Sequence, residues 1–351
     1  MGRLVLGAVG DVMLSKPLSR GFSDALTILN RVDVATANLE APFTSGGDAA
    51  DKWVALRQDP ILSKEYVKIG FRVLNIANNH MLDYGVEGLL STIYVLRKNG
   101  ILYVGGGVNL EEALSHKIFK KNGISIAFLG CASTLPGNSI AGRSTPGLAP
   151  LRVRTTYYIE PEMEKEQPGT PPVIFTEVVQ EDLDRIIAAV KKAKSEADFV
   201  VLSIHWGMAY QENILDYQLQ AARAFIDAGA KLILGHHPHR VQAVERYGKG
   251  FIFYSLGDFF FDISDFAPIN TKWRHWPPKV GMWSKSDDSL LVKTVFDPNG
   301  DTSIDVIPCS KGANGQPVIL QGAKGRKLLQ RLKGLSEGTD LKIKDDVAHL
   351  E

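Results

Sequence analysis

The amino-acid sequence predicts an α/β fold built around a parallel β-sheet. In the first part of the chain, short apolar runs without helical periodicity alternate with amphipathic segments, an order typical of parallel strands joined by helices. Each apolar run leads into a polar residue, as strands do at the carboxyl edge of such a sheet. At 351 residues with 44% hydrophobic content, the chain is long enough to bury a large core.

The composition excludes several classes of protein. Forty Lys and Arg residues stand against thirty-nine Asp and Glu residues, so the net charge of +1 indicates neither a nucleic-acid nor a membrane partner. Cys131 and Cys309 are too few for a disulfide framework, although a single bridge between them stays open. The amino terminus lacks the features of a signal peptide, and no apolar run is long enough to cross a membrane. We therefore expect a cytoplasmic protein.

Three early strands end in residues that can bind a metal. The strands are expected at residues 4–9, 34–37 and 73–77, and their ends carry Asp11, Glu40, and Asn79 with His80. The intervening segments have helical spacing, and the predicted helices cover residues 17–30, 61–70 and 86–98. A weaker strand follows at residues 102–104.

The middle of the chain is less regular. Residues 117–121 and 125–129 flank Asn122-Gly123, which predicts a β-hairpin with a tight turn. Residues 133–172 are rich in Pro, Gly, Ser and Thr, and we interpret them as an insertion loop that could act as a lid. Residues 181–197 form a clearly amphipathic helix.

The second half supplies three more strand ends with the same kind of residue. Strands at 199–204, 232–234 and 251–254 lead into His205, the sequence Gly235-His236-His237-Pro238-His239, and Asp258. Antiparallel strands are expected at residues 290–296, 303–308 and 318–320, followed by a helix at residues 324–333. We divide the chain into one domain, residues 1–322, and a carboxyl-terminal helix and tail, residues 323–351. Residues 273–278, rich in Trp and Pro, are candidates to line a substrate cleft or to cover an apolar edge.

The six strand ends together predict one site. A single polar residue after a strand is usually structural, but six in one chain are difficult to explain by capping. Carboxylates, imidazoles and an amide suit two divalent cations about 3.5 to 4 Å apart, with one carboxylate bridging them. Such a pair binds anionic oxygens and stabilises the charge that develops on a leaving group. A set of this kind accepts Mn, Fe, Zn or Co.

The strand ends carry six motifs in this order: Gly10-Asp11, Asn38-Leu39-Glu40, Ala77-Asn78-Asn79-His80, His205-Trp206-Gly207, Gly235-His236-His237-Pro238-His239 and Tyr254-Ser255-Leu256-Gly257. In combination they resemble the CapA family of poly-γ-glutamate synthesis proteins, a branch of the calcineurin-like metallophosphoesterase superfamily. The resemblance implies a four-layer α/β/β/α sandwich of two mixed sheets, with the site at the carboxyl ends of the strands.

The resemblance also implies a role for each motif residue. Glu40 stands where the superfamily has its bridging aspartate. One metal shell would be completed by Asn79, His205 and His237, and the other would contain Asp11 and His239. His80 would be the proton donor to the leaving group, or an orienting group if a carboxylate such as Asp83 fixes it.

Four positions decide how far the pattern holds. Met13 replaces a superfamily histidine, so the cation at Glu40 is expected to bind tightly and the occupancy of the Asp11 position stays open. Ala209 replaces a glutamate of the family. Asp258 replaces an asparagine and is expected either to orient a histidine or to act as a catalytic acid or base. Arg57 resembles a family position where a guanidinium could clamp a phosphate or carboxylate of the substrate.

Three functions follow as alternatives. We favour a metal-dependent hydrolase of a phosphoester or γ-glutamyl-type substrate, a small molecule, polymer or peptide with anionic groups. The second is a non-catalytic accessory component of poly-γ-glutamate synthesis, against which we count the absence of an amino-terminal membrane anchor. The third is a metal-independent peptide epimerase resembling the lasso-peptide epimerases, in which an Asp/His pair would move a proton at an α-carbon.

Overall fold

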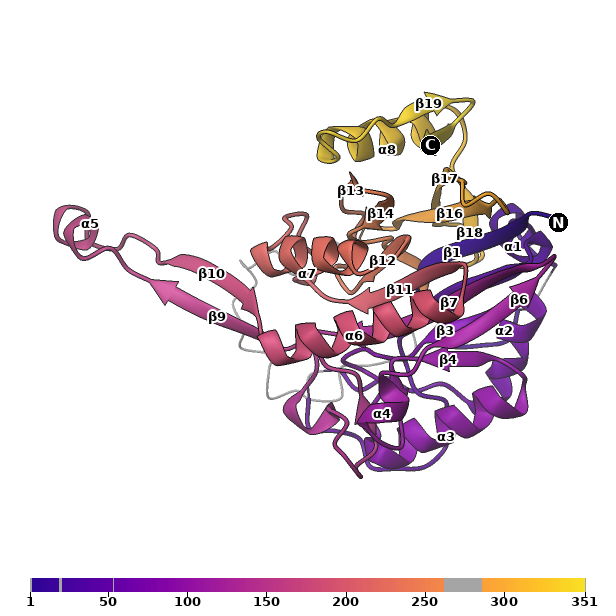
Figure 1. The fold of residues 1–351 in the computed structure, drawn as a ribbon, viewed down its shortest axis with the longest axis horizontal. Coiled ribbons are helices and arrows are strands. Elements are labelled where there is room, and N and C mark those ends of the chain that lie inside the picture. Colours follow the sequence, from indigo (N-terminus) through magenta and orange to yellow (C-terminus); the bar gives the residue numbers. More distant parts are fainter. Residues whose placement is uncertain (1, 19–20, 53, 262–285, 351) are drawn as a thin grey trace.

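Two mixed β-sheets form the centre of the computed structural model (Figure 1). The structure describes residues 2–18, 21–52, 54–261 and 286–350, so residues 273–278 lie outside the described residues. The larger sheet contains β1 (Leu4–Met13), β2 (Val34–Leu39), β3 (Phe71–Asn75), β4 (Leu102–Val104), β15 (Asp258–Phe261), β16 (Asp288–Phe296), β17 (Thr302–Lys311), β18 (Pro317–Ile319), β19 (Lys342–Lys344) and β20 (Val347–Leu350). The smaller sheet contains β6 (Lys117–Lys121), β7 (Ile124–Ala132), β11 (Phe199–His205), β12 (Leu232–His236), β13 (Val244–Tyr247) and β14 (Gly250–Phe253).

The strand pairing follows the predicted directions. Strands β1 to β4 pair in parallel in chain order, whereas β16, β17 and β18 pair antiparallel. In the smaller sheet β7, β11, β12 and β14 are parallel, and β6 and β13 form antiparallel edges. The turn between β6 and β7 has positive φ at Asn122 (56°) and Gly123 (82°), as a tight hairpin turn requires. The predicted hairpin is therefore confirmed.

Helices cover the outer faces of both sheets. Side chains from the inner faces, among them Leu6, Phe128 and Leu234, form one apolar core between the sheets. The outer face of the larger sheet packs against α1 (Asp24–Arg31), α2 (Ser63–Ile69) and α3 (Gly85–Lys98). The outer face of the smaller sheet packs against α6 (Gln180–Glu196) and α7 (Asp216–Asp227). The α/β class with two mixed sheets is confirmed, and the metallophosphoesterase type of this sandwich stays a prediction.

The segment 133–172, expected to be irregular, contains regular elements. After η2 (Gly137–Ser139) and β8 (Gly147–Leu148), which pairs with β5 (Gly106–Gly107), the chain forms a two-stranded arm that projects from the body (Figure 1). The arm consists of β9 (Val153–Tyr158), α5 (Pro161–Glu166) and β10 (Val173–Val178). The interpretation of residues 133–172 as a lid stays a prediction.

The carboxyl-terminal segment contributes to the larger sheet. Residues 323–351 include most of α8 (Gly322–Leu335) and the strands β19 and β20, and β20 pairs with β17. The remaining short helices are η1 (Pro60–Leu62) and α4 (Leu110–Ala113). These pairings connect the segment predicted as a tail to the same core as β16 and β17.

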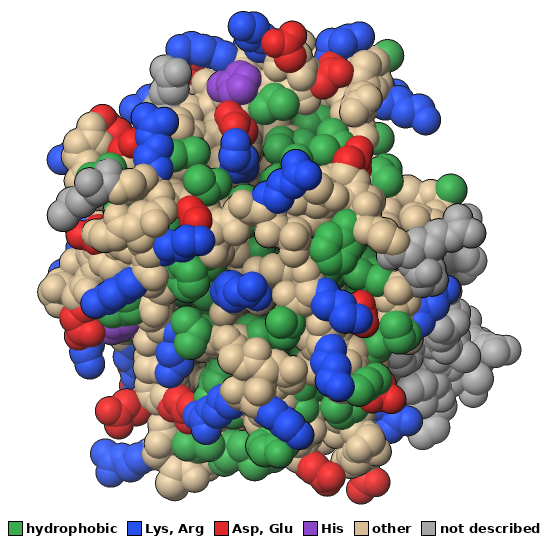
Figure 2. Space-filling view, turned by 90° about the vertical axis from the view of Figure 1, so that its right-hand side faces the viewer, with side chains coloured by type: hydrophobic (Ala, Val, Ile, Leu, Met, Phe, Trp, Pro, Cys, Tyr) green, Lys and Arg blue, Asp and Glu red, His purple; other side chains and the backbone are tan. Residues whose placement is uncertain are grey.

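The surface is chemically mixed. On the face shown in Figure 2, Lys and Arg side chains are interspersed with carboxylates and apolar side chains and form no single continuous patch.

Cys131 and Cys309 are both buried free thiols. Among the residues that the structure describes, no helix is long and apolar enough to span a bilayer.

Candidate metal centre

The candidate site lies where strand ends of the two sheets meet. Asp11 belongs to β1 and Glu40 follows β2 in the larger sheet, whereas His205 ends β11 in the smaller sheet. His237 and His239 follow β12, which is the neighbour of β11. The side chains of Asp11, Glu40 and His205 are fully buried. The predicted convergence of strand ends from distant parts of the chain is therefore observed in the structure.

One group of donor atoms surrounds Nε2 of His205. This nitrogen lies 2.8 Å from Oδ1 of Asn79, 3.1 Å from Nδ1 of His237 and 3.7 Å from Oε1 of Glu40. Burial and the neighbouring imidazoles lower the pKa values of His205 and His237 well below the ordinary value, so both rings are neutral. Neutral imidazoles, an amide oxygen and a carboxylate are suitable ligands for a divalent transition metal.

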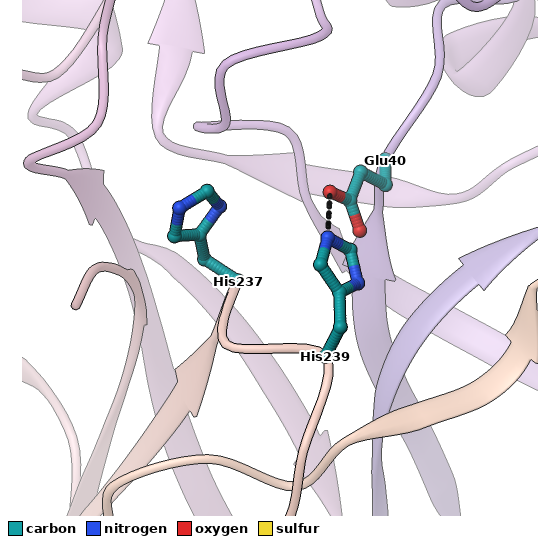
Figure 3. Close-up of side chains that lie close together, drawn as sticks. All are labelled: Glu40, His237 and His239. Atoms are coloured by element: carbon teal, nitrogen blue, oxygen red, sulfur yellow. Dashed lines mark ion pairs between the residues drawn. The ribbon is translucent and has the colours of Figure 1, made fainter. Parts of the chain in front are cut away.

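Glu40 is the residue whose surroundings best fit a cation. Both of its carboxylate oxygens are buried and have no hydrogen-bond partner within the described ranges. Its Oε1 lies 3.6 Å from Nε2 of His239, and His237 flanks the same space (Figure 3). Burial and the charge of Asp11 raise the pKa of Glu40 well above its ordinary value. A buried carboxylate without a hydrogen-bond partner is costly, so a bound cation is the natural partner for this group.

A second group of donor atoms surrounds Nδ1 of His239. This nitrogen lies 2.7 Å from Oδ1 of Asp258 and 3.8 Å from Oδ2 of Asp11. Burial alone would lower the pKa of His239, but the carboxylates of Asp258, Glu40 and Asp11 outweigh it and raise the pKa well above the ordinary value. Burial raises the pKa of Asp11 to about 7, with a further contribution from Asp258. Three buried or half-buried carboxylates therefore share the charge of one imidazole.

Asp258 reaches the site by a route that differs from the expected one. It was predicted to stand at the carboxyl end of the strand at 251–254, but the chain leaves β14 of the smaller sheet and enters the larger sheet as β15. Strand β15 pairs in parallel with β1, and Asp258 lies opposite Asp11. The neighbouring strand, and not a strand of the smaller sheet, therefore delivers this carboxylate.

Three asparagines connect the two halves of the site. The Asn38 amide nitrogen donates to Oδ1 of Asp11 at 2.8 Å and lies 3.3 Å from Nδ1 of His205. The amide nitrogens of Asn75 and Asn78 in turn donate to Oδ1 of Asn38, at 3.0 and 3.2 Å. Sequence reasoning gave no role to this network. Asn38 and Asn78 lie inside the quoted motifs and were within reach of prediction, whereas Asn75 lies inside β3 without such a signal.

His80 belongs to a separate network beside the metal-type residues. Its Nδ1 lies 2.6 Å from Oδ2 of Asp83, and Oδ1 of Asp83 accepts a hydrogen bond from Nζ of Lys52 at 2.6 Å. The same Oδ2 accepts the backbone N–H of Leu56 at 2.7 Å. Burial lowers the pKa of His80, although Asp83 opposes the change. The sequence indicated Asp83 as a partner for His80, but it gave no signal for Lys52.

The histidine turn has an unusual backbone. His237 (φ 94°) and His239 (φ 52°) both adopt positive φ on either side of Pro238, and Tyr210 (φ 64°) does so nearby. The Tyr210 backbone N–H donates to the Pro238 carbonyl at 2.8 Å, and its ring stacks on that of His239 with centroids 5.4 Å apart. Such conformations are costly for non-glycine residues and are concentrated at functional sites. Sequence reasoning missed Tyr210.

Other singled-out residues lie outside the two donor groups. Arg57 is exposed, with its guanidinium 5.0 Å from the ring centroid of Tyr84. Met13 packs in an apolar cluster with Ala41 and Leu56, as expected for a packing residue. His236 is buried, and neither ring nitrogen has a hydrogen-bond partner among the described residues, although its Nδ1 lies 3.5 Å from Oδ1 of Asp11.

Comparisons with known proteins place these motifs in context. The family model described as bacterial capsule synthesis protein PGA_cap matches residues 5–263, a range that contains every motif from Asp11 to Asp258. The chain is similar to capsule biosynthesis protein CapA of Bacillus anthracis, with 30% identity over 98% of this chain and 76% of that protein. It is also similar to PGA biosynthesis protein CapA of Bacillus subtilis (strain 168), with 31% identity over 92% of this chain and 76% of that protein. A Mycobacterium tuberculosis protein described as a probable polyglutamine synthesis accessory protein is 28% identical over 79% of this chain and 66% of its own length.

Proposed function

Because the chain belongs to the CapA family of bacterial capsule synthesis proteins, we propose that it is a metal-dependent hydrolase of the metallophosphoesterase type. Its substrate would contain a phosphoester or a γ-glutamyl-type bond. The observation that carries the proposal is the buried Glu40 carboxylate, whose two oxygens have no hydrogen-bond partner among the described residues and which faces imidazoles from both donor groups. A protein with a purely structural core at this position would have no use for such a carboxylate.

The residues present would hold two cations. Glu40, Asn79, His205 and His237 would hold one, and Asp11 with His239 would hold the other, with Glu40 between them. When bound, divalent cations at such a site polarise a phosphoryl or carbonyl oxygen and supply a nucleophile at neutral pH. The asparagine network around Asn38 fixes Asp11 and His205 before any cation arrives.

His80 is placed to donate a proton to the leaving group. Asp83 occupies Nδ1 of the ring, so Nε2 is the nitrogen that can exchange a proton with a substrate. Lys52 binds the other oxygen of Asp83 and the backbone carbonyl of Asn79, which ties His80 to the strand end that carries the metal-type amide. The exposed Arg57, whose guanidinium lies over the ring of Tyr84 next to Asp83 in the chain, is the candidate to bind an anionic group of the substrate.

A non-catalytic accessory role is the second candidate. It is supported by the description of the Mycobacterium tuberculosis relative as an accessory protein of polyglutamine synthesis. In that case the cluster would bind cations and an anionic polymer without turnover. The metal-independent epimerase has no comparable support, because the Glu40 carboxylate, which lacks a hydrogen-bond partner among the described residues, favours a site with cations.

The test is a cation-dependent hydrolysis assay on purified protein. After removal of bound metals with a chelator, the protein is supplied with Mn²⁺, Fe²⁺, Zn²⁺ or Co²⁺ and an aryl phosphate diester, an aryl phosphate monoester or γ-glutamyl-p-nitroanilide. We expect cation-dependent turnover of at least one substrate and its loss in Glu40→Gln. The matched control is Glu337→Gln on the exposed surface, which should leave turnover unchanged.

Two outcomes would contradict the hydrolase. Turnover in Glu40→Gln at the wild-type level would show that the measured hydrolysis does not depend on the cation site at Glu40. Binding of cations and of poly-γ-glutamate without turnover of any substrate would favour the accessory role.

A further inference from the structure

We propose that Asp258 is a metal ligand that takes the place of the histidine missing at residue 13, and that it gives the second cation an oxygen-rich shell together with Asp11 and His239. The inference rests on the proposed function only in requiring that the cluster binds cations. It assigns a third protein ligand to the cation position that the sequence left incomplete. It also predicts that the two positions prefer different metals.

The first argument is the position of Asp258 in the sheet. A histidine at residue 13 would follow Asp11 on the same strand, but Met13 packs with Ala41 and Leu56 in an apolar cluster. Strand β15 lies beside β1 and places Asp258 in register with Asp11. Strand β15 therefore supplies a hard oxygen donor next to Asp11. Strand β1 itself supplies no second ligand, because Met13 stands at that position.

The second argument is the spacing of the donor atoms. Around Nε2 of His205, the other donors lie 2.8 to 3.7 Å away. Around Nδ1 of His239, Asp258 and Asp11 lie 2.7 and 3.8 Å away. Ligand atoms about 2.1 Å from one octahedral cation are roughly 3 Å apart when adjacent and roughly 4 Å apart when opposite. The distances between donor atoms fit this spacing in both groups, so the second group is as well arranged to bind a cation as the first.

The third argument is charge. Asp11 is fully buried and stands beside Asp258 on the adjacent strand, and Glu40 lies within 3.6 Å of the same imidazole without a hydrogen-bond partner in the described parts of the chain. Carboxylates placed together in a low-dielectric interior repel one another unless a cation neutralises them. One imidazole cannot balance three carboxylates, whereas a divalent cation at Asp11, Asp258 and His239 would balance the charges of Asp11 and Asp258.

The composition of the two shells predicts their metal preference. Glu40, Asn79, His205 and His237 offer two nitrogens, which favour Zn²⁺, Co²⁺ or Fe²⁺. Asp11, Asp258 and His239 offer two carboxylates and one nitrogen, which favours Mn²⁺ or Mg²⁺. We therefore expect a site that holds two different metals when both kinds are supplied.

The experiment measures metal binding and does not depend on activity. Metal-free protein is titrated with Mn²⁺ alone, and again after one equivalent of Zn²⁺, by calorimetry and by the electron paramagnetic resonance signal of free Mn²⁺. We expect the Zn²⁺-loaded protein to bind one further equivalent of Mn²⁺. Asp258→Asn should weaken this Mn²⁺ equivalent at least tenfold and leave the Zn²⁺ equivalent in place, while Asp258→Glu should retain much of the Mn²⁺ affinity.

The variants separate a ligand from an orienting group. An asparagine at 258 can still accept the N–H of His239, so an Asp258 that only orients this ring would leave Mn²⁺ affinity unchanged in Asp258→Asn, and this result would overturn the proposal. Loss of both equivalents in Asp258→Asn would also overturn it, because it would indicate a structural role. The charge-matched control is Asp305→Asn, at the β16–β17 surface.

The result can be separated from the fate of the proposed function. Two unlike metal equivalents in a protein that hydrolyses none of the substrates would support the metal inference and contradict the hydrolase. Hydrolysis with a single cation, unaffected by Asp258→Asn, would support the hydrolase and contradict the metal inference.

Discussion

Gly10 passes so close to Gly257 that a Cβ atom on Gly10 would lie 1.7 Å from the carbonyl oxygen of Gly257. The Asp11 backbone N–H donates to this same carbonyl at 3.1 Å. The contact holds the start of β15 against β1 and so sets the separation between Asp11 and Asp258. Residue 10 must be a glycine because a side chain would collide with the Gly257 carbonyl. Its φ is not in the left-handed region, so backbone conformation is not the reason.

Replacing Gly10 by alanine should therefore damage the second cation position. We expect Gly10→Ala to push β15 away from β1, to lower the melting temperature, and to lose the Mn²⁺ equivalent assigned to Asp11, Asp258 and His239. Calorimetric titration and thermal unfolding measure both effects. Gly334→Ala is the control, because Gly334 is exposed on α8 with no atom within 4 Å of an added Cβ. Equal Mn²⁺ binding by Gly10→Ala and wild type would refute the role of this contact.

The strand ends were predictable from sequence because apolar runs and their polar ends are local patterns. Parallel strands bring their carboxyl ends to one edge whatever the loops between them do, so Asp11, Glu40 and His205 could be assigned to one site. The route of Asp258 could not be predicted, because Ser255-Leu256-Gly257 contains no signal for which sheet the chain enters next. That choice is made by contacts between distant strands.

The residues missed by sequence reasoning share a physical cause. Lys52 lies in a loop, and its role exists only because Asp83, 31 residues later, accepts its ammonium group. Asn75 looks like an interior strand residue until Asn38 of the neighbouring strand provides its acceptor.

The arm formed by β9 and β10 exposes large apolar side chains, among them Tyr157 (67%) and Ile174 (53%). Without a buried face, a strand has no alternation of apolar and polar residues that would predict it.

Glu40 should make the metal-free protein less stable and the metal-loaded protein more stable. Its carboxylate is buried without a hydrogen-bond partner in the described residues, so at pH 8 without metal it carries a desolvation cost that a neutral amide reduces. We expect Glu40→Gln to melt at a higher temperature than wild type in chelator, and to gain less than wild type when Zn²⁺ and Mn²⁺ are added. Differential scanning calorimetry measures both. A wild-type gain from metals in Glu40→Gln would mean that Glu40 is not a ligand.

Stabilisation by added metal should depend on pH. Burial raises the pKa of Asp11 from 3.8 to about 7, so the folded protein without metal holds a proton there between these values whereas the unfolded chain does not. Stability from this group is therefore present at low pH and is lost as the pH rises through about 7. A cation needs the ionised carboxylate and competes with that proton.

The increase in melting temperature caused by Mn²⁺ should accordingly be larger at pH 8 than at pH 5.5. The comparison is made with wild type and with Asp11→Asn, which cannot ionise and keeps an acceptor for the amide of Asn38. We expect the pH dependence of the Mn²⁺ effect to be reduced in Asp11→Asn. An Mn²⁺ effect that is equal at both pH values in wild type would show that Asp11 takes no part in binding the cation.

The last prediction concerns His80, whose Nδ1 is held by Asp83 at 2.6 Å and whose backbone adjoins Asn79 in the metal-type group. If Nε2 donates a proton to the leaving group, His80→Ala should lower kcat by roughly 10²- to 10⁴-fold and leave the metal content unchanged. Asp83→Asn should lower kcat by a smaller factor, because the ring keeps its position but loses the carboxylate that stabilises its protonated form. His116→Ala, at a histidine paired with Glu196 on another part of the chain, is the control and should retain full activity. Metal analysis by inductively coupled plasma mass spectrometry accompanies each kinetic measurement. Loss of metal in proportion to loss of activity in His80→Ala would place His80 in the coordination shell, and the proton-donor role would then be wrong.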